Sequence, residues 1–320
     1  MSIDRILAAA AAQPWALMPE KLAEIRAFLE LRSEGVRFTA AEIEARVGPG
    51  RTGESGVTGP GAVAVIPIIG IMTQRANMLD AISGPGGTST EMVGAQLRRA
   101  IANPDVKSIL LEIDSPGGST YGVQELADEV HRARDRKTVV AQVNSLAASA
   151  AYWVASAASE VVMTPGGDVG SIGVYGTHSD MSGAMEKAGI RKTFISAGKY
   201  KTEGHPFEPL TDEARDYAQR RVNEAYETFV GSVARGRGTT SAQVKAEFGQ
   251  GRTVGAREAV RLGMVDRIGT MQDTFRRLST AAPVGSPSRA LAPAGMLAAD
   301  ALAASGRDEL RRRRHRLRTL

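Results

Sequence analysis

The fold is decided by the stretch NSLAASAAYWVA, residues 144–155, in which Ser149 stands among small apolar side chains. The preceding residues 137–143, KTVVAQV, are rich in β-branched side chains, which predicts a short buried strand. Residues 150–158 contain no Gly or Pro and predict a buried helix. Ser149 is therefore expected at a strand-to-helix turn, where its hydroxyl leaves the sheet beside the first N–H groups of the helix. Taken alone, this serine also fits a packing residue in an Ala-rich helix.

Strands and helices alternate on both sides of this unit. The apolar residues 63–71 and 106–113 predict buried strands, and Pro67 indicates an edge or a bulge in the first. Thr90 is expected to cap a helix that runs to about residue 102, and a second helix is expected over about 120–134. This alternation predicts an α/β fold with largely parallel strand pairing. The other expected elements are short strands near Val161 and Val174, a helix near 182–188, a strand over 192–196, a long amphipathic helix over 211–236, and a helix with a short strand over 253–266.

The two ends of the chain differ from its middle. Apolar spacing in residues 19–29 and a capping box, TAAE at 39–42, predict helices near the start. A Gly- and Pro-rich stretch follows, and the end of the chain is rich in Ala, Pro, Ser and then Arg. The chain is thus divided into a helical segment at 1–50, a linker at 51–60, a domain at 61–278 and a tail at 279–320 that is expected to be disordered.

The composition excludes several kinds of chemistry. The chain has no cysteine, which rules out disulfides, thiol nucleophiles and thiolate metal sites. Its four histidines are too scattered to form a local metal-ligand pattern, so neither a metal nor a cofactor is expected. No stretch approaches the roughly 20 apolar residues of a membrane-spanning helix. Residues 1–12 include Asp4 and only a short apolar run, and are interpreted as a helix of a cytoplasmic protein rather than a signal peptide.

The net charge of +5 comes from the end of the chain. Residues 307–320 contain seven Arg against one Asp and one Glu, so the rest of the chain is electrically balanced. The body is therefore not expected to bind nucleic acid, and only the Arg-rich tail is a candidate for such contact.

A serine hydroxyl is a weak nucleophile at neutral pH and needs a general base. Histidine is the usual base, but His178 and His205, the two nearest the expected core, have no recognisable triad context. A lysine whose burial favours the neutral amine can serve instead. Lys199 and Lys201 follow a predicted strand end, so one of them can point toward Ser149 while the other points to solvent.

Acyl transfer also requires N–H donors for the oxyanion. Gly117 and Gly118 follow a predicted strand and allow the backbone to approach a substrate closely, although a glycine pair is also typical of an ordinary turn. The N–H of Ala150, at the expected start of the helix, is the second candidate donor.

Four motifs combine these residues, namely DSPGG at 114–118, LAASAAY at 146–152, VGSIGV at 169–174 and GKYK at 198–201. Together they resemble the S49 family of serine peptidases, which includes signal peptide peptidase A and phage capsid-assembly proteases, over about residues 61–270. The resemblance implies that Ser149 is the nucleophile and that Lys201 is the general base, with Lys199 as the runner-up. It further implies that Ser171 hydrogen-bonds the base lysine.

The resemblance also carries expectations about fold and assembly. It implies stacked ββα units similar to caseinolytic protease and crotonase subunits, usually assembled into rings, so a homo-oligomer is expected. The sequence departs from the family at Asp114, where Asn is common, and at Ala150 and Ala151, where glycines are common. The two alanines predict a narrower substrate cleft. The small residues around Ser149 predict that this cleft takes extended polypeptide with small side chains near the cut.

The sequence therefore predicts a Ser–Lys endopeptidase that cleaves polypeptide through an acyl-enzyme. A single copy of the domain with a helical N-terminal segment and a basic tail favours the phage or prophage type, which processes scaffold and capsid proteins in the host cytoplasm or prohead. Three alternatives stay open, namely cytosolic protein degradation of the signal-peptide-peptidase type, an acyl-CoA enzyme of the crotonase type, and a non-catalytic capsid-assembly or scaffold protein.

Overall fold

The computed structural model describes residues 14–24, 27, 57–58, 62–75 and 87–280. All of them belong to one of the two units into which the chain divides, Met1–Pro283. The predicted helices at 1–12 and from the capping box at 39–42, most of the predicted linker, and the predicted tail from residue 281 onward lie outside the described residues.

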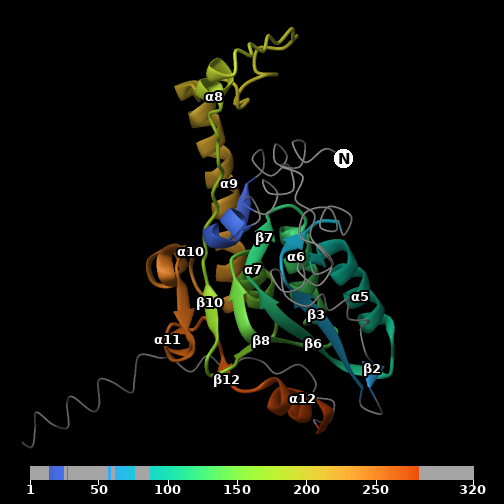
Figure 1. Cartoon of the computed structure of the whole chain (residues 1–320). Coiled ribbons are helices and arrows are strands. Elements are labelled where there is room, and N and C mark those ends of the chain that lie inside the picture. Colours follow the sequence, from blue (N-terminus) through green and yellow to red (C-terminus); the bar gives the residue numbers. More distant parts are fainter. Residues whose placement is uncertain (1–13, 25–26, 28–56, 59–61, 76–86, 281–320) are drawn as a thin grey trace, which may run out of the picture. The chain divides into compact units, whose positions relative to one another are not determined.

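A parallel sheet built around β8 (Thr138–Ala148) forms the centre of the fold (Figure 1). Along one edge β8 pairs with β6 (Val106–Ser115), which in turn pairs with β3 (Ala62–Ile69). Along its other edge β8 pairs with β9 (Glu160–Met163) and then, near its end, with β10 (Asp168–Gly170). All these pairings are parallel, so the predicted α/β fold is confirmed. The outer strands are β2 (Val57–Thr58), antiparallel to β3; β11 (Thr253–Gly255), antiparallel to β10; and β12 (Arg267–Ile268), parallel to β9.

A second, smaller sheet follows the end of β6. Its order is β1-β7-β4-β5, so that β7 (Gly117–Ser119) lies between β1 (Trp15–Leu17) and β4 (Met72–Thr73), with β5 (Thr88–Ser89) outside β4. β7 begins two residues after β6 ends, because Pro116 separates them. The small sheet therefore holds the glycine pair directly beyond the carboxyl end of a central strand.

Helices cover both faces of the large sheet, as is typical of parallel sheets. On β6, Ile109 and Leu111 pack into the main core with the helices, whereas Leu110 packs with Leu278 on the opposite face. The main core side is covered by α5 (Thr90–Ala102), α6 (Val123–Ala133), α7 (Ala150–Ser156) and the second half of α9 (Asp212–Arg237), and the opposite face by α12 (Met271–Thr280). The remaining helices are α8 (Ser182–Lys187), α10 (Ser241–Glu247), the short 3-10 helix Gly249–Gly251 and α11 (Ala256–Arg261).

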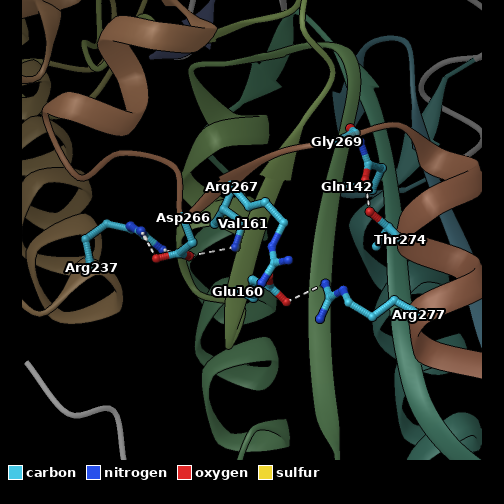
Figure 2. Close-up of polar contacts among 9 residues, drawn as sticks. All are labelled: Gln142, Glu160, Val161, Arg237, Asp266, Arg267, Gly269, Thr274 and Arg277. Carbon is cyan, nitrogen blue, oxygen red and sulfur yellow. Dashed lines mark hydrogen bonds and ion pairs between the residues drawn. The ribbon is translucent and has the colours of Figure 1, made fainter. Parts of the chain in front are cut away.

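A buried ion pair ties the end of α9 to the central sheet (Figure 2). The Arg237 guanidinium, 1% exposed, donates to both carboxylate oxygens of Asp266 at 2.9 and 2.8 Å. One of those oxygens also accepts from the backbone N–H of Val161 in β9, at 2.8 Å. Because the guanidinium is paired with a carboxylate, it can be kept out of water, while the Asp266 side chain stays 28% exposed.

Polar contacts also hold α12 in place (Figure 2). Gln142 of β8 is fully buried, donates to the Gly269 carbonyl at 3.1 Å and accepts from the Thr274 hydroxyl at 2.6 Å. The Glu160 carboxylate of β9 forms ion pairs with Arg267 and Arg277. The segment after Asp266 is thereby fixed to β8 and β9, the strands on either side of Ser149 in the sequence.

Several element boundaries differ from the sequence predictions. β8 continues to Ala148, so the strand runs directly into the serine. The N-cap of α5 is Ser89, whose hydroxyl accepts from the Met92 N–H at 3.3 Å, rather than Thr90. The strand expected near Val174 is β10, which ends earlier, at Gly170. Residues 192–196, which were expected to form a strand, form none and are exposed. In the segment predicted to be helical, Trp15–Leu17 form a strand before the helical residues 19–24.

Candidate active site

Ser149 lies between the end of β8 and the start of α7, as predicted. Its backbone has φ 54° and ψ −119°, a conformation that costs free energy for a residue with a side chain. The turn is fixed because the Ser149 N–H donates to the Gly170 carbonyl at 2.7 Å and the Ser149 carbonyl accepts from Trp153 at 2.9 Å. The alanines on either side are completely buried, and Ser149 is only 1% exposed. The small side chains allow the sheet and helix to close tightly around the hydroxyl.

The backbone of Gly117 passes directly beside the serine. Gly117 has φ +100°, and a Cβ atom built on it would lie 3.0 Å from Ser149 Cβ and 2.3 Å from the Ala16 carbonyl oxygen. A Cβ on Gly118 would lie 1.8 Å from the Met72 carbonyl oxygen. Both positions therefore require glycine for steric reasons, and the glycine pair is more than an ordinary turn.

The N–H groups predicted to hold the oxyanion lie around this point. The Gly117 N–H donates to the Ser115 hydroxyl at 3.2 Å, and that hydroxyl donates to the Gly70 carbonyl at 2.6 Å. Gly118 is paired with Ala16 of β1. Ala150 is the first residue of α7, which has no side-chain cap, so its N–H has no partner within the helix.

The loop after β10 closes the other side of the site. Ser171 is buried with φ 51°, and its N–H donates to the Arg252 carbonyl at 2.8 Å. Two residues later, the Gly173 carbonyl is 3.5 Å from the Ser149 hydroxyl oxygen, a long hydrogen bond. The structure thus brings Ser149 together with Gly117, Gly118, Ala150 and the loop that carries Ser171.

Neither candidate lysine is beside Ser149. Lys199 and Lys201 are both exposed, and within the described residues no hydrogen bond or ion pair joins either of them to Ser149. Hydrogen bonds to the Tyr200 hydroxyl at 2.8 Å and the Glu213 carboxylate at 3.1 Å raise the pKa of Lys199, which favours its charged form. A charged ammonium cannot accept a proton, so Lys199 in this arrangement is not a base.

Both lysines lie on an exposed segment, residues 176–211, that is called the arm below. Figure 1 shows the arm and α8 at the N-terminal end of α9, away from α7. His178 and His205 also lie there, with a ring nitrogen of His178 3.2 Å from the His205 carbonyl oxygen. The arm exposes large apolar side chains at Met181, Ile190, Phe194, Ile195 and Tyr200. Such an unpartnered apolar surface is typical of a region that contacts another protein.

The sequence predictions missed two features near the site. The first is β1, whose three residues are buried beside Gly117 and Gly118. The single Trp at position 15 of a polar, Ala-rich N-terminal region was the signal that could have indicated burial. The second is the partial burial of Asp114 near the end of β6, which raises the pKa of its carboxyl above the usual range.

The described part of the chain has neither a metal-binding cluster nor a membrane-spanning helix. It holds no group of three or more His, Asp or Glu side chains that could bind a metal ion. None of its helices combines the length and apolar character that crossing a membrane requires.

Known proteins are similar to this chain over about 180 to 220 residues. The chain is 38% identical over 182 residues to a candidate protease of Methanocaldococcus jannaschii, covering 57% of this chain and 58% of that protein. It is 34% identical over 213 residues to Capsid assembly protease C of Escherichia phage lambda, covering 67% and 48%. It is 34% identical over 220 residues to Head-tail preconnector protein GP5 of Enterobacteria phage P21, covering 68% and 43%. The chain thus spans about half the length of these relatives.

Among solved structures, a ClpP1 mutant from Listeria monocytogenes matches 65% of this chain and 92% of its own, with 18% identity and a TM-score of 0.40. The model of peptidase family S49 matches residues 131–285, which include Ser149, Ser171 and both lysines. This segment belongs to peptidase family S49, which confirms the family predicted from the motifs.

Proposed function

We propose that this protein is a serine endopeptidase in which Ser149 is the nucleophile and Lys201 the general base. The observation that carries the proposal is the position of Ser149, at a strained turn where its Cβ lies beside Gly117 of β7. The match of residues 131–285 to peptidase family S49 favours a peptidase rather than an acyl-CoA enzyme of the crotonase type. Among the relatives, those from phages lambda and P21 favour a role in processing capsid or scaffold polypeptide.

The exposed arm leads to a proposal about where the base comes from. Lys201 lies on a segment whose apolar side chains are exposed, including Ile195 at 100%. We infer that the arm packs against a second copy of the chain, where Lys201 reaches the partner's nucleophile. Burial in that contact would disfavour the charged ammonium and favour the neutral amine that a base requires. A homo-oligomer is then needed to complete the site.

The proposed reaction proceeds in two stages. The Ser149 oxygen bonds to the scissile carbonyl carbon while its proton moves to the neutral Lys201 nitrogen. The N–H of Ala150 stabilises the oxyanion together with that of Gly117 or Gly118, which must first leave its present partner, Ser115 for Gly117 and β1 for Gly118. The C–N bond then breaks as the lysine returns the proton to the leaving amine. Water attacks the resulting ester with the same lysine as base, which frees the carboxylic acid and restores the serine.

The proposal is tested with the full chain and fluorescein-labelled casein. We expect Ser149→Ala and Lys201→Ala to reduce cleavage by about 100-fold or more, since each removes a group used in bond making. Lys199→Ala is the matched control and should retain cleavage. A fluorophosphonate should label the parent chain and not Ser149→Ala.

Two results would count against this assignment. Cleavage that survives Ser149→Ala would remove the nucleophile from the proposal. Loss of cleavage in Lys199→Ala with retention in Lys201→Ala would move the base by two residues.

The natural substrate requires a separate experiment. The parent chain and Ser149→Ala are each co-expressed with a phage capsid protein and its scaffold protein, and the products are measured by mass spectrometry. Fragments that appear only with the parent chain are expected. Intact capsid and scaffold proteins, together with active casein cleavage, would favour the alternative of general protein degradation.

A further inference from the structure

The chain places one of its own strands in the space beside Ser149. β1 pairs antiparallel with β7, with Trp15 opposite Ser119, Ala16 opposite Gly118 and Leu17 opposite Gly117. On its other edge, the Trp15 N–H donates to the Tyr175 carbonyl at 2.8 Å, and the Tyr175 N–H donates to the Trp15 carbonyl at 3.1 Å. The blue strand near β7 in Figure 1 is this segment.

Successive residues of this segment direct their backbone hydrogen bonds to opposite sides of the strand. The Pro14 carbonyl accepts from Thr120 at 3.5 Å and the Met18 N–H donates to the Pro116 carbonyl at 3.1 Å, both on the β7 side. Trp15 uses its two backbone groups on the opposite side. An extended peptide bound by strand addition is held in the same manner, through its backbone and with alternating directions.

The segment also runs past the nucleophile. From Trp15 to Leu17 it proceeds along β7 from Ser119 toward Gly117, the residue that abuts Ser149. The Ala16 carbonyl oxygen and the Ser149 side chain both approach the same point beside Gly117, at 2.3 and 3.0 Å from the position a Cβ would take. A peptide backbone therefore already occupies the space in front of the serine.

The two large side chains of this segment are anchored apart from the main core, in which Ala16 is buried. Trp15 and Leu17 are buried with Leu22 and Ile71 in a small separate cluster, against which Tyr175 packs. Burial raises the pKa of Tyr175 to about 12, and the nearby Glu20 carboxylate adds to the shift. Because Trp15 and Leu17 lie outside the main core, displacing the segment takes from that core only the small Ala16 side chain.

We propose that Pro14–Met18 is an intramolecular occupant of the polypeptide-binding slot of Ser149, so that a substrate strand must displace it. The slot consists of β7 on one side and the backbone of Tyr175 on the other. It takes an extended polypeptide with a small residue at the Ala16 position between two large apolar residues. The assignment of the slot to substrate rests on the proposed function of Ser149.

A reversible tether tests this occupancy, and the absence of cysteine in the chain makes it selective. Trp15 and Ser119 are directly opposite, and since Trp15 bonds to Tyr175 they form a non-hydrogen-bonded pair, in which Cα atoms are close enough for a disulfide. The variant Trp15→Cys/Ser119→Cys is made in the full chain with Ser149→Ala. The probe is a fluorescein-labelled peptide of this chain's residues 14–19, PWALMP, and binding is measured by fluorescence anisotropy.

We expect the reduced variant to bind the peptide and the oxidised variant to bind it at least 10-fold more weakly. The matched controls are Trp15→Cys alone and Ser119→Cys alone, in which oxidation should change nothing. Equal binding by the oxidised and reduced double variant would overturn the proposal, as would a lack of binding in both.

A second variant provides an independent test in case the double-cysteine variant does not fold. Trp15→Ala/Leu17→Ala, again with Ser149→Ala, removes the apolar anchors and should bind the peptide at least 5-fold more tightly than its parent. Unchanged binding there would mean that β1 only completes the small sheet. Casein cleavage by the cysteine pair with Ser149 intact is a separate measurement. If peptide binding depends on the redox state but neither state cleaves casein, the proposed function is wrong and the occupation of the slot by β1 still stands.

Discussion

At the scale of single residues, the site depends on positions where the backbone conformation or a close contact restricts which residue fits. Ser149 and Ser171 both have positive φ values without being glycine, and they lie on the two segments that meet at the hydroxyl. Such strain persists only where the surrounding structure enforces it, and it is frequent at functional sites. Buried alanines around Ser149 and glycines in β7 provide that surrounding structure.

Gly117→Ala tests this close contact. The substitution adds a Cβ at positive φ and in collision with the Ala16 carbonyl and Ser149, so we expect a loss of about 2 kcal/mol or more in the free energy of unfolding. Casein cleavage should be lost as well, because the N–H donors and the serine are pushed apart. Gly166→Ala is the control, since a Cβ there meets nothing within 4 Å. A Gly117→Ala chain with parental melting temperature and activity would contradict the argument.

At the scale of elements, the site is held by the ends of strands and by contacts that arrive from later in the chain. β8 supplies the serine, β10 the loop with Ser171, and β7 the glycines. The Tyr152 hydroxyl of α7 donates to the Met264 carbonyl at 2.9 Å, and Asp266 binds both Arg237 and Val161. α7 is therefore anchored by the segment that connects α11 to β12.

The Arg237–Asp266 pair gives a prediction about stability. Asp266→Ala leaves the buried guanidinium without its carboxylate, and we expect about 3–5 kcal/mol of destabilisation. Glu258→Ala, which breaks an exposed pair with Arg261, should leave the melting temperature unchanged. Thermal unfolding of both variants measures the difference. Similar melting temperatures for the two would show that the buried pair is not an anchor.

At the scale of the whole molecule, the nucleophile and the proposed base lie on different parts of the chain. Ser149 is in the packed centre, while Lys201 is on the exposed arm. An enzyme built this way would be inactive as a single chain and active only once assembled. β1 in front of Ser149 would add a second condition, because assembly and displacement of the strand would both be required for cleavage.

Mixing inactive variants tests whether the site is shared. If Lys201 acts on a neighbouring copy, random co-assembly of Ser149→Ala with Lys201→Ala should restore about a quarter of the parental casein cleavage, because each copy offers the group that the other lacks. The two variants are mixed under dissociating conditions, reassembled and assayed, with each variant treated alone as the control. A mixture as inactive as its components, in an assembly of normal size, would mean that both groups act within one chain.

The sequence by itself determined the alternation of strands and helices, the strand-to-helix turn at Ser149 and the family of residues 131–285, because these depend on local composition and on motifs read along the chain. Only the tertiary structure decided that Gly117 abuts Ser149, that Trp15–Leu17 lie in front of it and that Lys201 is exposed on the arm. Residues 192–196 were predicted as a strand because their local pattern suits one, yet no neighbouring strand is present within the described residues to pair with them. Local pattern cannot report a partner that lies far along the chain, and strand pairing and proximity depend on such partners.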